Sequence, residues 1–406
     1  MKILAEYDLI VRRAKTREYP GKLVDIAISD GKIVDIKEKI ENRGKEEIDA
    51  GGRLVTPPFV DAHLHMCKVY TYLMIGEEAI KHYHESEMGT SELAIILASK
   101  IKEKYNESWI YENVKKAALE AIEYGTLYIR AFVDTDTKAK LEGIKALLRV
   151  RDELKDKITI QVVAFPQDGV VRDPGAEEYV RKAIELGADV VGGIPWIEIT
   201  PEDEDTHIER MFEIAKEFNR DVAMLTDDTG DPGLRTTEKL AKKAIKEGWK
   251  GRVTANHARA ASMYTKPYLT KLAQLLKMAD MSLITDPHTG PLHIPVKFFL
   301  SQGVNVALGQ DDIADAYYPY GNNNMLEIAF LNSHILWMTT LQDMETLFTM
   351  ITYNAAKAMR IENYGLHVGG RGDLLILNAN SIYEAIWRHE KPMRVIRGGT
   401  ILSHNH

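Results

Sequence analysis

Length, composition and charge place this chain among globular proteins that bury a large core. It has 406 residues, of which 45% are hydrophobic and 28% charged, enough for one large core and a smaller one. No apolar run reaches the roughly 18 residues that a membrane span needs, and acidic residues interrupt the N-terminus where an export signal would be apolar. The net charge of −8, with both signs interspersed, argues against nucleic acid as the main partner.

Cysteine usage excludes further classes of protein. Cys67 is the only cysteine, so the chain has no intrachain disulfide and no thiolate zinc cluster. The zinc deaminases that act on nucleic-acid bases need a Pro-Cys-x-x-Cys ligand motif, which a single cysteine cannot supply. We therefore expect a cytoplasmic protein outside that class of deaminases.

Both ends of the chain have β character. Residues 1–55 alternate short apolar runs with turn residues, which predicts strands at 7–12, 24–28 and 32–36. The same pattern returns near the C-terminus, at 373–377, 392–396 and 400–402. The N-terminal unit is too thin to be stable alone. We therefore expect residues 1–55 and 365–406 to pair and to form one small β-sandwich domain.

The intervening residues 56–364 repeat a strand, a loop and an amphipathic helix. Eight strands are predicted, at 59–63, 127–133, 158–165, 190–194, 222–225, 252–257, 281–285 and 304–308. Such an alternation fits an α/β fold of the (β/α)8 TIM-type barrel class better than a doubly wound sheet. No Gly-rich phosphate loop follows any of these strands, which further weakens a nucleotide-binding fold.

The stretch His63-Leu64-His65 ends the first predicted barrel strand. Successive strand side chains point to opposite faces, so both histidines project from the same side, about 6 to 7 Å apart along the strand. At that spacing two imidazoles can converge on one divalent ion. In a barrel of this class the active site lies at the C-terminal ends of the strands, which is where this pair falls.

The other strand ends carry a consistent polar set. It comprises Asp134, Gln167, Asp227, Asp228, His257, Asp286, His288, Asp311 and Asp312. We interpret Asp134 and Asp286 as loop caps, and Asp227-Asp228 either as a solvated turn or as part of the site. Two imidazoles and a carboxylate make a Lewis-acid site for Zn²⁺ or Fe²⁺. Asp311 suits the role of ligand and base, and His257 can hold or polarise a water molecule from the opposite wall.

Several longer stretches carry a resemblance to a known family. They are Phe59–His65, Gln161–Gln167, Gly187–Ile194, Arg252–His257, Gln310–Ile313, Tyr318–Gly321, Asn324–Leu326 and Tyr364–Leu375. Together they resemble the cytosine deaminase branch of the amidohydrolase superfamily, and the aminotriazine (N-alkylammelide) hydrolases of that branch look about as similar. The resemblance runs nearly end to end. It implies a metal-dependent barrel hydrolase that removes an amino group, or a substituted amine, from a nitrogen heterocycle.

The resemblance implies roles for individual positions. His63, His65 and Asp311 match metal ligands of the first and eighth strands, and His257 matches the sixth-strand histidine beside the metal-bound water. Gln167 matches the residue that hydrogen-bonds the substrate ring, and Asp312 a neighbouring acid of the substrate site. We predict one divalent ion held by His63, His65, His257 and Asp311, with Asp311, His257 and Asp228 as catalytic residues and Gln167 and Asp312 as substrate-binding residues.

The chain also departs from the family pattern. Leu225 stands where the family has a metal-ligand histidine at the end of the fifth strand, and Asp228 stands where it has a proton-shuttling glutamate. His257, His288 or Asp227 would then complete the metal shell. Ile194-Pro195-Trp196 offers no lysine at the end of the fourth strand, so one metal is expected rather than two.

Three readings follow for the function. The first is an active deaminase or amidohydrolase that acts on a small nitrogen heterocycle, as a homo-oligomer without a nucleic-acid or membrane partner. The second is a catalytically impaired or redesigned barrel that binds a small heterocycle or a protein partner, with Leu225 as its main support. The third is a hydrolase of cyclic amides from the same superfamily, against which the absence of that lysine counts.

Overall fold

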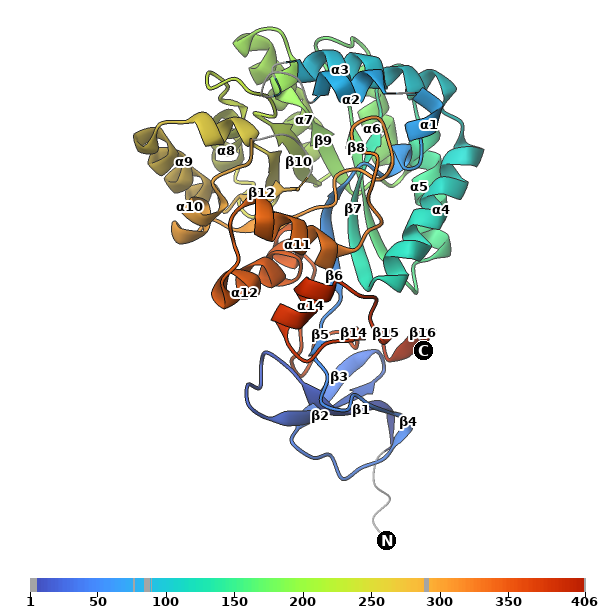
Figure 1. The fold of residues 1–406 in the computed structure, drawn as a ribbon. Coiled ribbons are helices and arrows are strands. Elements are labelled where there is room, and N and C mark those ends of the chain that lie inside the picture. The colour runs from blue at the N-terminus through green and yellow to red at the C-terminus, as the bar shows by residue number, and fades with distance from the viewer. Residues whose placement is uncertain (1–5, 76, 84–87, 89, 288–291, 405–406) are drawn as a thin grey trace.

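The computed structural model describes residues 6–75, 77–83, 88, 90–287 and 292–404. Figure 1 shows a large barrel with helices around it and a smaller β unit beneath, to which both chain ends contribute. The predicted α/β class, a (β/α)8 barrel with a small β-sandwich, is confirmed. Among the described residues, no helix combines the length and the apolar character that crossing a membrane requires.

Eight parallel strands form the barrel in the order of the sequence. They are β6 (Phe59–Leu64), β7 (Thr126–Asp134), β8 (Thr159–Phe165), β9 (Val190–Gly193), β10 (Asp221–Thr226), β11 (Val253–His257), β12 (Ser282–Thr285) and β13 (Val306–Leu308). A parallel bridge between Leu64 and Asp311 closes the barrel between its first strand and the residues after its last. The backbone N–H of His65 donates to the carbonyl of Asp311 at 2.7 Å, so the closure lies at the mouth.

Amphipathic helices cover the outside of the barrel. They are α4 (Glu107–Glu123), α5 (Glu142–Glu153), α6 (Ala176–Leu186), α7 (Pro201–Glu217), α8 (Thr236–Lys246), α9 (Lys266–Ala279), α10 (Val296–Ser301), α11 (Met325–Ile335), α12 (Leu341–Met350) and α13 (Tyr353–Ala358). In α5 the buried Ile144, Leu147 and Val150 recur every three residues, which places them on the one face that packs on the sheet.

A helical insertion separates β6 from α4. It comprises a 3-10 helix (Met66–Lys68), α1 (Tyr72–Ile75), α2 (Glu78–Tyr83), α3 (Ser91–Ala98) and a second 3-10 helix (Ser99–Lys104). In Figure 1 these helices lie at the end of the barrel where the strands terminate. The hydroxyl of Ser91 donates to that of Thr229 at 2.8 Å, so α3 is attached to the loop that follows β10.

The small β unit consists of two four-stranded sheets, with strand orders β3-β2-β1-β4 and β16-β15-β14-β5. Their strands are β1 (Tyr7–Lys15), β2 (Leu23–Ser29), β3 (Lys32–Lys37), β4 (Gly44–Asp49), β5 (Val55–Thr56), β14 (Leu374–Ile376), β15 (Arg394–Arg397) and β16 (Thr400–His404), and α14 (Ile382–Arg388) follows β14. Leu9, Ile26, Leu374 and Ile396 belong to one shared core.

The two chain ends contact each other through both backbone and side chains. Among the described N-terminal strands, β5 alone joins the C-terminal sheet, where it pairs antiparallel with β14. The other N-terminal strands form a sheet of their own, which meets the C-terminal residues through a shared core and through backbone contacts such as the bridge between Lys32 and Arg371. Because β6 begins three residues after β5, the pairing of β5 with β14 anchors the start of the first barrel strand. The domain boundaries at residues 55 and 365 stay a prediction.

Candidate metal centre and active site

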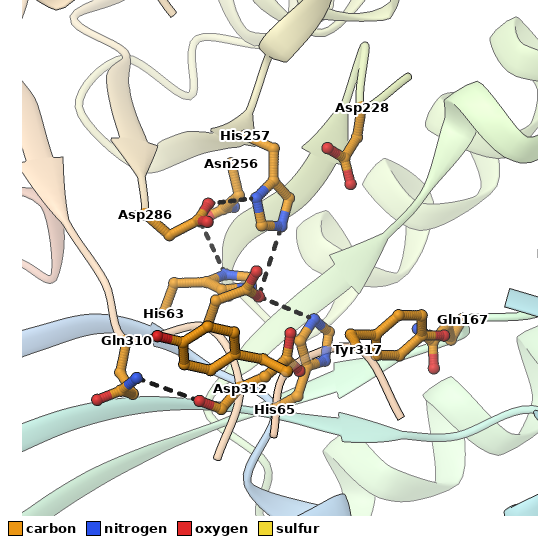
Figure 2. A network of polar contacts seen from close by, with 12 residues as sticks. His63, His65, Gln167, Asp228, Asn256, His257, Asp286, Gln310, Asp312 and Tyr317 are labelled. Carbon is orange, nitrogen blue, oxygen red and sulfur yellow. Dashed lines mark hydrogen bonds and ion pairs between the residues drawn. The ribbon is translucent and has the colours of Figure 1, made fainter. Parts of the chain in front are cut away.

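Four buried side chains converge at the mouth of the barrel. One ligand atom from each of His63, His65, His257 and Asp311 lies within 4.8 Å of every other. The Nε2 atoms of the three imidazoles lie 3.0, 3.6 and 3.8 Å, in that order, from Oδ1 of Asp311. Figure 2 shows the three rings turned toward one common region. Two of them come from β6, the third ends β11, and Asp311 follows β13.

The donor atoms of this cluster fit a divalent ion. Nε2 of His63 and Oδ1 of Asp311 are buried and have no hydrogen-bond partner among the described residues, although they lie 3.0 Å apart. A buried polar atom without a partner costs about 1–3 kcal/mol, and an ion between the two atoms would remove that cost. Three imidazoles and one carboxylate form a donor set that suits Zn²⁺ or Fe²⁺.

Neighbouring polar groups fix the orientation of two of the imidazoles. Nδ1 of His63 donates to Oδ1 of Asn256 at 3.1 Å, and the amide of Asn256 is itself held because its Nδ2 donates to the carbonyl of Met224. Nδ1 of His257 donates to Oδ2 of Asp286 at 2.9 Å. Both rings therefore direct Nε2 at the cluster, as metal-ligating histidines do when an oxygen atom holds their Nδ1. Asp286 thus contacts side chains of the site, and its interpretation as a loop cap stays a prediction.

The electrostatic environment keeps most of the cluster ready to bind a cation. Burial lowers the pKa of His63 and lowers that of His65 further, with the charge of Lys68 adding to the effect on His65. Burial alone would raise the pKa of Asp311, but His257 and His63 outweigh it and lower the pKa. The pKa of His257 rises to about 8, because Asp228 and Asp311 outweigh its burial. Neutral imidazoles and an ionised carboxylate are the forms that bind metal.

Backbone strain is concentrated at the same place. His257, Ala258 and Asp311 have φ angles of +69°, +46° and +66°. This left-handed region costs a residue with a side chain on the order of 1–3 kcal/mol and persists only where the surroundings enforce it. The N–H of Ala258 donates to the carbonyl of Thr226 at 2.9 Å, which holds that turn. Two of the four cluster residues are thus presented by strained backbone.

The predicted substrate residues lie beside the cluster and are linked to a buried lysine. Nζ of Lys68 donates to Oε1 of Gln167 at 2.5 Å, and Nε2 of Gln167 donates to the hydroxyl of Tyr317 at 3.2 Å. Gln167, Asp312 and Tyr317 line the same small cavity as His65. Burial alone would lower the pKa of Lys68, but Asp134 and other acids outweigh it and raise the pKa. The lysine is therefore a permanent cation at the site.

The two aspartates after β10 have different roles. Asp228 lines the cavity, and its Oδ1 accepts from Nη1 of Arg259 at 2.6 Å. Asp227 turns away, and its oxygens accept from the backbone N–H groups of Thr236 and Thr237 in the first turn of α8. Asp227 therefore caps a helix and does not complete the metal shell. His288, the other alternative ligand, lies outside the described residues.

The wall opposite the cluster is apolar. Leu225 and Ile194 line the cavity together with Ile95 of α3, and the ring of Phe132 lies 4.1 Å from that of His63, centroid to centroid. The cavity is about 20 Å³, room for roughly one water molecule. The cavity is therefore smaller than a heterocycle in this structure, and Ile95 is the lining residue contributed by the helical insertion.

Sequence reasoning missed Lys68, Asn256 and Arg259. Lys68 and Arg259 are each a charged residue within a short buried stretch after a strand end, at Met66–Lys68 and Arg259–Ala261. A charge flanked by small or apolar residues directly after a predicted ligand was the available signal. Asn256 offered no such signal, since only the pairing of β10 with β11 places it beside Met224 and His63.

A (β/α)8 barrel with histidines and an aspartate converging at its mouth defines a class, the metal-binding barrels of hydrolytic enzymes. The comparison with known proteins gives the family within that class. The model described as "Amidohydrolase family" matches residues 46–402, and the chain belongs to this family.

Several proteins of known name are similar to this chain over nearly its whole length. N-isopropylammelide isopropyl amidohydrolase from Pseudomonas sp. (strain ADP) is 36% identical over 406 residues, covering 98% of this chain and 97% of its own. Pterin deaminase from Rhizobium rhizogenes is 24% identical over 93% of this chain and 87% of its own. The crystal structure of 5-methylcytosine deaminase from Klebsiella pneumoniae with 5-fluorocytosine superposes with a TM-score of 0.90 at 30% identity, covering 98% of each chain.

Proposed function

We propose that this protein is a metal-dependent deaminase or amidohydrolase that hydrolyses an exocyclic C–N bond of a cytosine-like or aminotriazine-like nitrogen heterocycle. The observation that carries the proposal is the convergence of His63, His65, His257 and Asp311, with two buried donor atoms left without a partner. One Zn²⁺ or Fe²⁺ ion is the cofactor we assign to these four residues.

A bound divalent ion would supply Lewis-acid activation of water at neutral pH. Asp311 is the carboxylate placed to accept the proton of that water, and His257 faces the same point from β11. Asp228 is the acid for the leaving nitrogen, since burial raises the pKa of its carboxyl despite His257 and Arg259. We assign these roles because Asp311, His257 and Asp228 all line the cavity.

Substrate orientation falls to the polar side of the cavity. Gln167 already donates to Tyr317 and accepts from Lys68. Its amide therefore has a fixed orientation and still offers one N–H and one lone pair. A ring edge that presents a carbonyl beside an N–H matches this pair, and Asp312 lines the same wall. Cytosine-like and hydroxytriazine-like rings both have such an edge.

The relatives support a nitrogen heterocycle as the substrate class. Those with named activities include an N-isopropylammelide amidohydrolase, a pterin deaminase and a 5-methylcytosine deaminase. All three names describe removal of an amine or an amino group from such a ring. We carry the class over to this chain and leave the particular ring to experiment. Cytoplasmic location and a homo-oligomeric state stay predictions.

One observation favours a second candidate, an impaired barrel that binds a heterocycle without turning it over. Leu225 lines the cavity at the place where a β10 ligand would stand, so the ion would rest on one fewer strand. Metal content of the purified protein distinguishes the two. Near-stoichiometric zinc or iron supports the enzyme, and a stable protein that stays metal-free after zinc is supplied supports the binder.

The activity is tested by a metal-replete screen of aminopyrimidines, aminotriazines, aminopterins and N-alkyl derivatives, scored by release of ammonia or amine. Release from at least one ring, abolished by a chelator and restored by Zn²⁺ or Fe²⁺, is the expected result. The matched control is the His63→Ala variant carried through the same screen. Turnover that survives both chelation and His63→Ala would contradict the proposal.

A further inference from the structure

Arg259 is a buried guanidinium directly behind the metal cluster. It begins the 3-10 helix Arg259–Met263 after β11 and is 1% exposed. Its Nη1 donates to Oδ1 of Asp228 at 2.6 Å, and its Nη2 donates to Oδ1 and Oδ2 of Asp286 at 2.7 and 2.9 Å. One side chain therefore connects the loops that follow β10 and β12.

Asp286 transmits this connection to the cluster. The carboxylate that Arg259 holds is the one that accepts from Nδ1 of His257, whose Nε2 lies 3.8 Å from Oδ1 of Asp311. Figure 2 shows Asp286 at one edge of the His257 ring, with Asp228 beyond the ring. The contacts form a chain from Arg259 through Asp286 to His257, and Nη1 of Arg259 also lies 3.2 Å from Nδ1 of His257 itself.

The orientation of His257 needs such support. Its φ of +69° is followed by +46° at Ala258, so the backbone alone presents this ring in a strained conformation. On the adjacent strand β10, Leu225 pairs in register with Asn256 and offers no donor atom. The third imidazole of the cluster therefore depends on this one strained position.

We infer that Arg259 is a positioning residue that makes His257 a metal ligand, by clamping Asp286 against Nδ1 of His257. The inference rests on the proposed metal-dependent function and deepens it. It explains how the cluster keeps a third imidazole although β10 supplies none. A second contact of Arg259, to Asp228, ties the acid of the site to the same clamp.

The positive charge of Arg259, taken alone, would have the opposite effect and weaken metal binding. Nη2 of Arg259 lies 3.9 Å from Oδ2 of Asp311, so its positive charge stands close to the place of the ion. If repulsion dominated, removing or displacing that charge would tighten metal binding. If positioning dominates, loss of the two-carboxylate clamp weakens it. The sign of the change in zinc affinity therefore decides between the two.

The test compares Arg259→Lys with a matched variant, Arg130→Lys. Arg130 is another arginine buried in the barrel, 2% exposed, and its hydrogen bonds among the described residues go to Gln161 and Thr254 rather than to the cluster. Lysine keeps the charge but offers one nitrogen on a shorter side chain, in place of the planar fork with which Arg259 holds Asp228 and Asp286 from two nitrogens. Zinc affinity of the metal-free proteins is measured by chelator competition, and the visible spectrum of the Co²⁺ forms reports the coordination.

We expect Arg259→Lys to weaken zinc binding by about tenfold or more and to change the Co²⁺ spectrum, with Arg130→Lys within about twofold of the parent protein. The double variant Arg259→Lys/Asp286→Asn tests whether Arg259 acts on His257 through Asp286. If Arg259 acts through Asp286, adding Arg259→Lys to Asp286→Asn produces little further loss. Unchanged or tighter zinc binding, or fully additive losses, would overturn the inference.

Two further measurements keep the outcome decisive. If Arg259→Lys does not fold, Asp286→Asn alone must show the tenfold loss, and normal binding there overturns the inference. His63→Ala separates this inference from the proposed function. Full zinc binding in His63→Ala defeats the metal-dependent function itself, whereas loss there with normal binding in Arg259→Lys defeats only the role of Arg259.

Discussion

The two sides of the barrel mouth differ in what they offer a ligand. One side, from β6, β11 and the residues after β13, presents the cluster residues His63, His65, His257 and Asp311. The other side, from β7 to β10, presents the strand residues Phe132, Phe165, Ile194 and Leu225, which belong to one hydrophobic cluster with Ile95 of α3; the polar Gln167 and Asp228 line the cavity from the loops after β8 and β10. We call these the ligand side and the apolar side.

This difference separates two tasks within one cavity. The four residues of the ligand side come from β6, β11 and the segment after β13, so we expect this side to bind an ion without a ligand from β10. We expect the apolar side to accept the face of a ring, since flat heterocycles pack well on apolar side chains. A substitution on one side should change metal binding, and one on the other should change substrate selection.

The largest effect on metal binding and activity is expected when a histidine of the ligand side is removed. In His63→Ala and His65→Ala we expect bound metal to fall from about one ion per chain to near none, and activity to be lost with it. Metal analysis and turnover on the same preparations measure both. The control is His207→Gln, which alters a buried histidine paired with Glu198 outside the cluster. Full metal occupancy in both alanine variants would mean that the His-x-His stretch is only structural.

Placing a ligand on the apolar side should have the next largest effect. Leu225 is 3% exposed and lines the cavity, so Leu225→His brings a fourth imidazole toward the ion. We expect zinc affinity to rise at least about tenfold, roughly 1.4 kcal/mol, with faster deaminase-type turnover. Leu225→Met serves as the control of similar volume. Unchanged affinity together with a lower melting temperature would contradict the placement of Leu225 beside the ion.

A substitution at the polar end of the cavity should weaken substrate binding more than metal binding. Gln167→Ala is expected to raise KM about fivefold, the value of one hydrogen bond of about 1 kcal/mol, and to leave bound metal unchanged. Tyr317→Phe, which removes only the hydroxyl that accepts from Gln167, should have a smaller effect. Loss of metal in Gln167→Ala would instead place this amide in the coordination shell.

The smallest effect is expected where the insertion covers the cavity. Ile95→Ala enlarges the space beside His65 and Leu225 and should favour bulkier leaving amines over ammonia. We expect the ratio of kcat/KM values to shift by about threefold, less than the tenfold or more that one methylene can contribute. Ile96→Ala, at a neighbouring position that is 46% exposed, is the control. An equal shift in both variants would argue against a role for Ile95 in the cavity wall.

The sequence predicted the scaffold well for a physical reason. Parallel strands are buried on both faces and read as continuous apolar runs, and β7 is buried at all nine of its positions. Helices between them show one apolar face. These local patterns sufficed for the eight barrel strands. They did not predict β5, which has only two residues, or β4, whose residues are mostly exposed and charged.

The site was predictable only in part. His63, His65 and Asp311 follow from their places at strand ends, and the structure brings them together with His257. The partners that orient these residues could not be predicted from the sequence, because Asn256, Asp286 and Arg259 act through contacts between different strands and loops. Asp227 was considered as a possible ligand, whereas it caps α8. That role depends on a contact with α8 that the neighbouring residues in sequence do not indicate.

The bridge between Leu64 and Asp311 also bears on how the protein is made. The two β6 histidines leave the ribosome long before Asp311, the carboxylate that completes the donor set. An ion held by all four residues would therefore be loaded after the residues behind the last strand have joined the first strand, and it would connect both sides of that seam. We expect removal of such an ion to loosen the seam before any other part of the barrel.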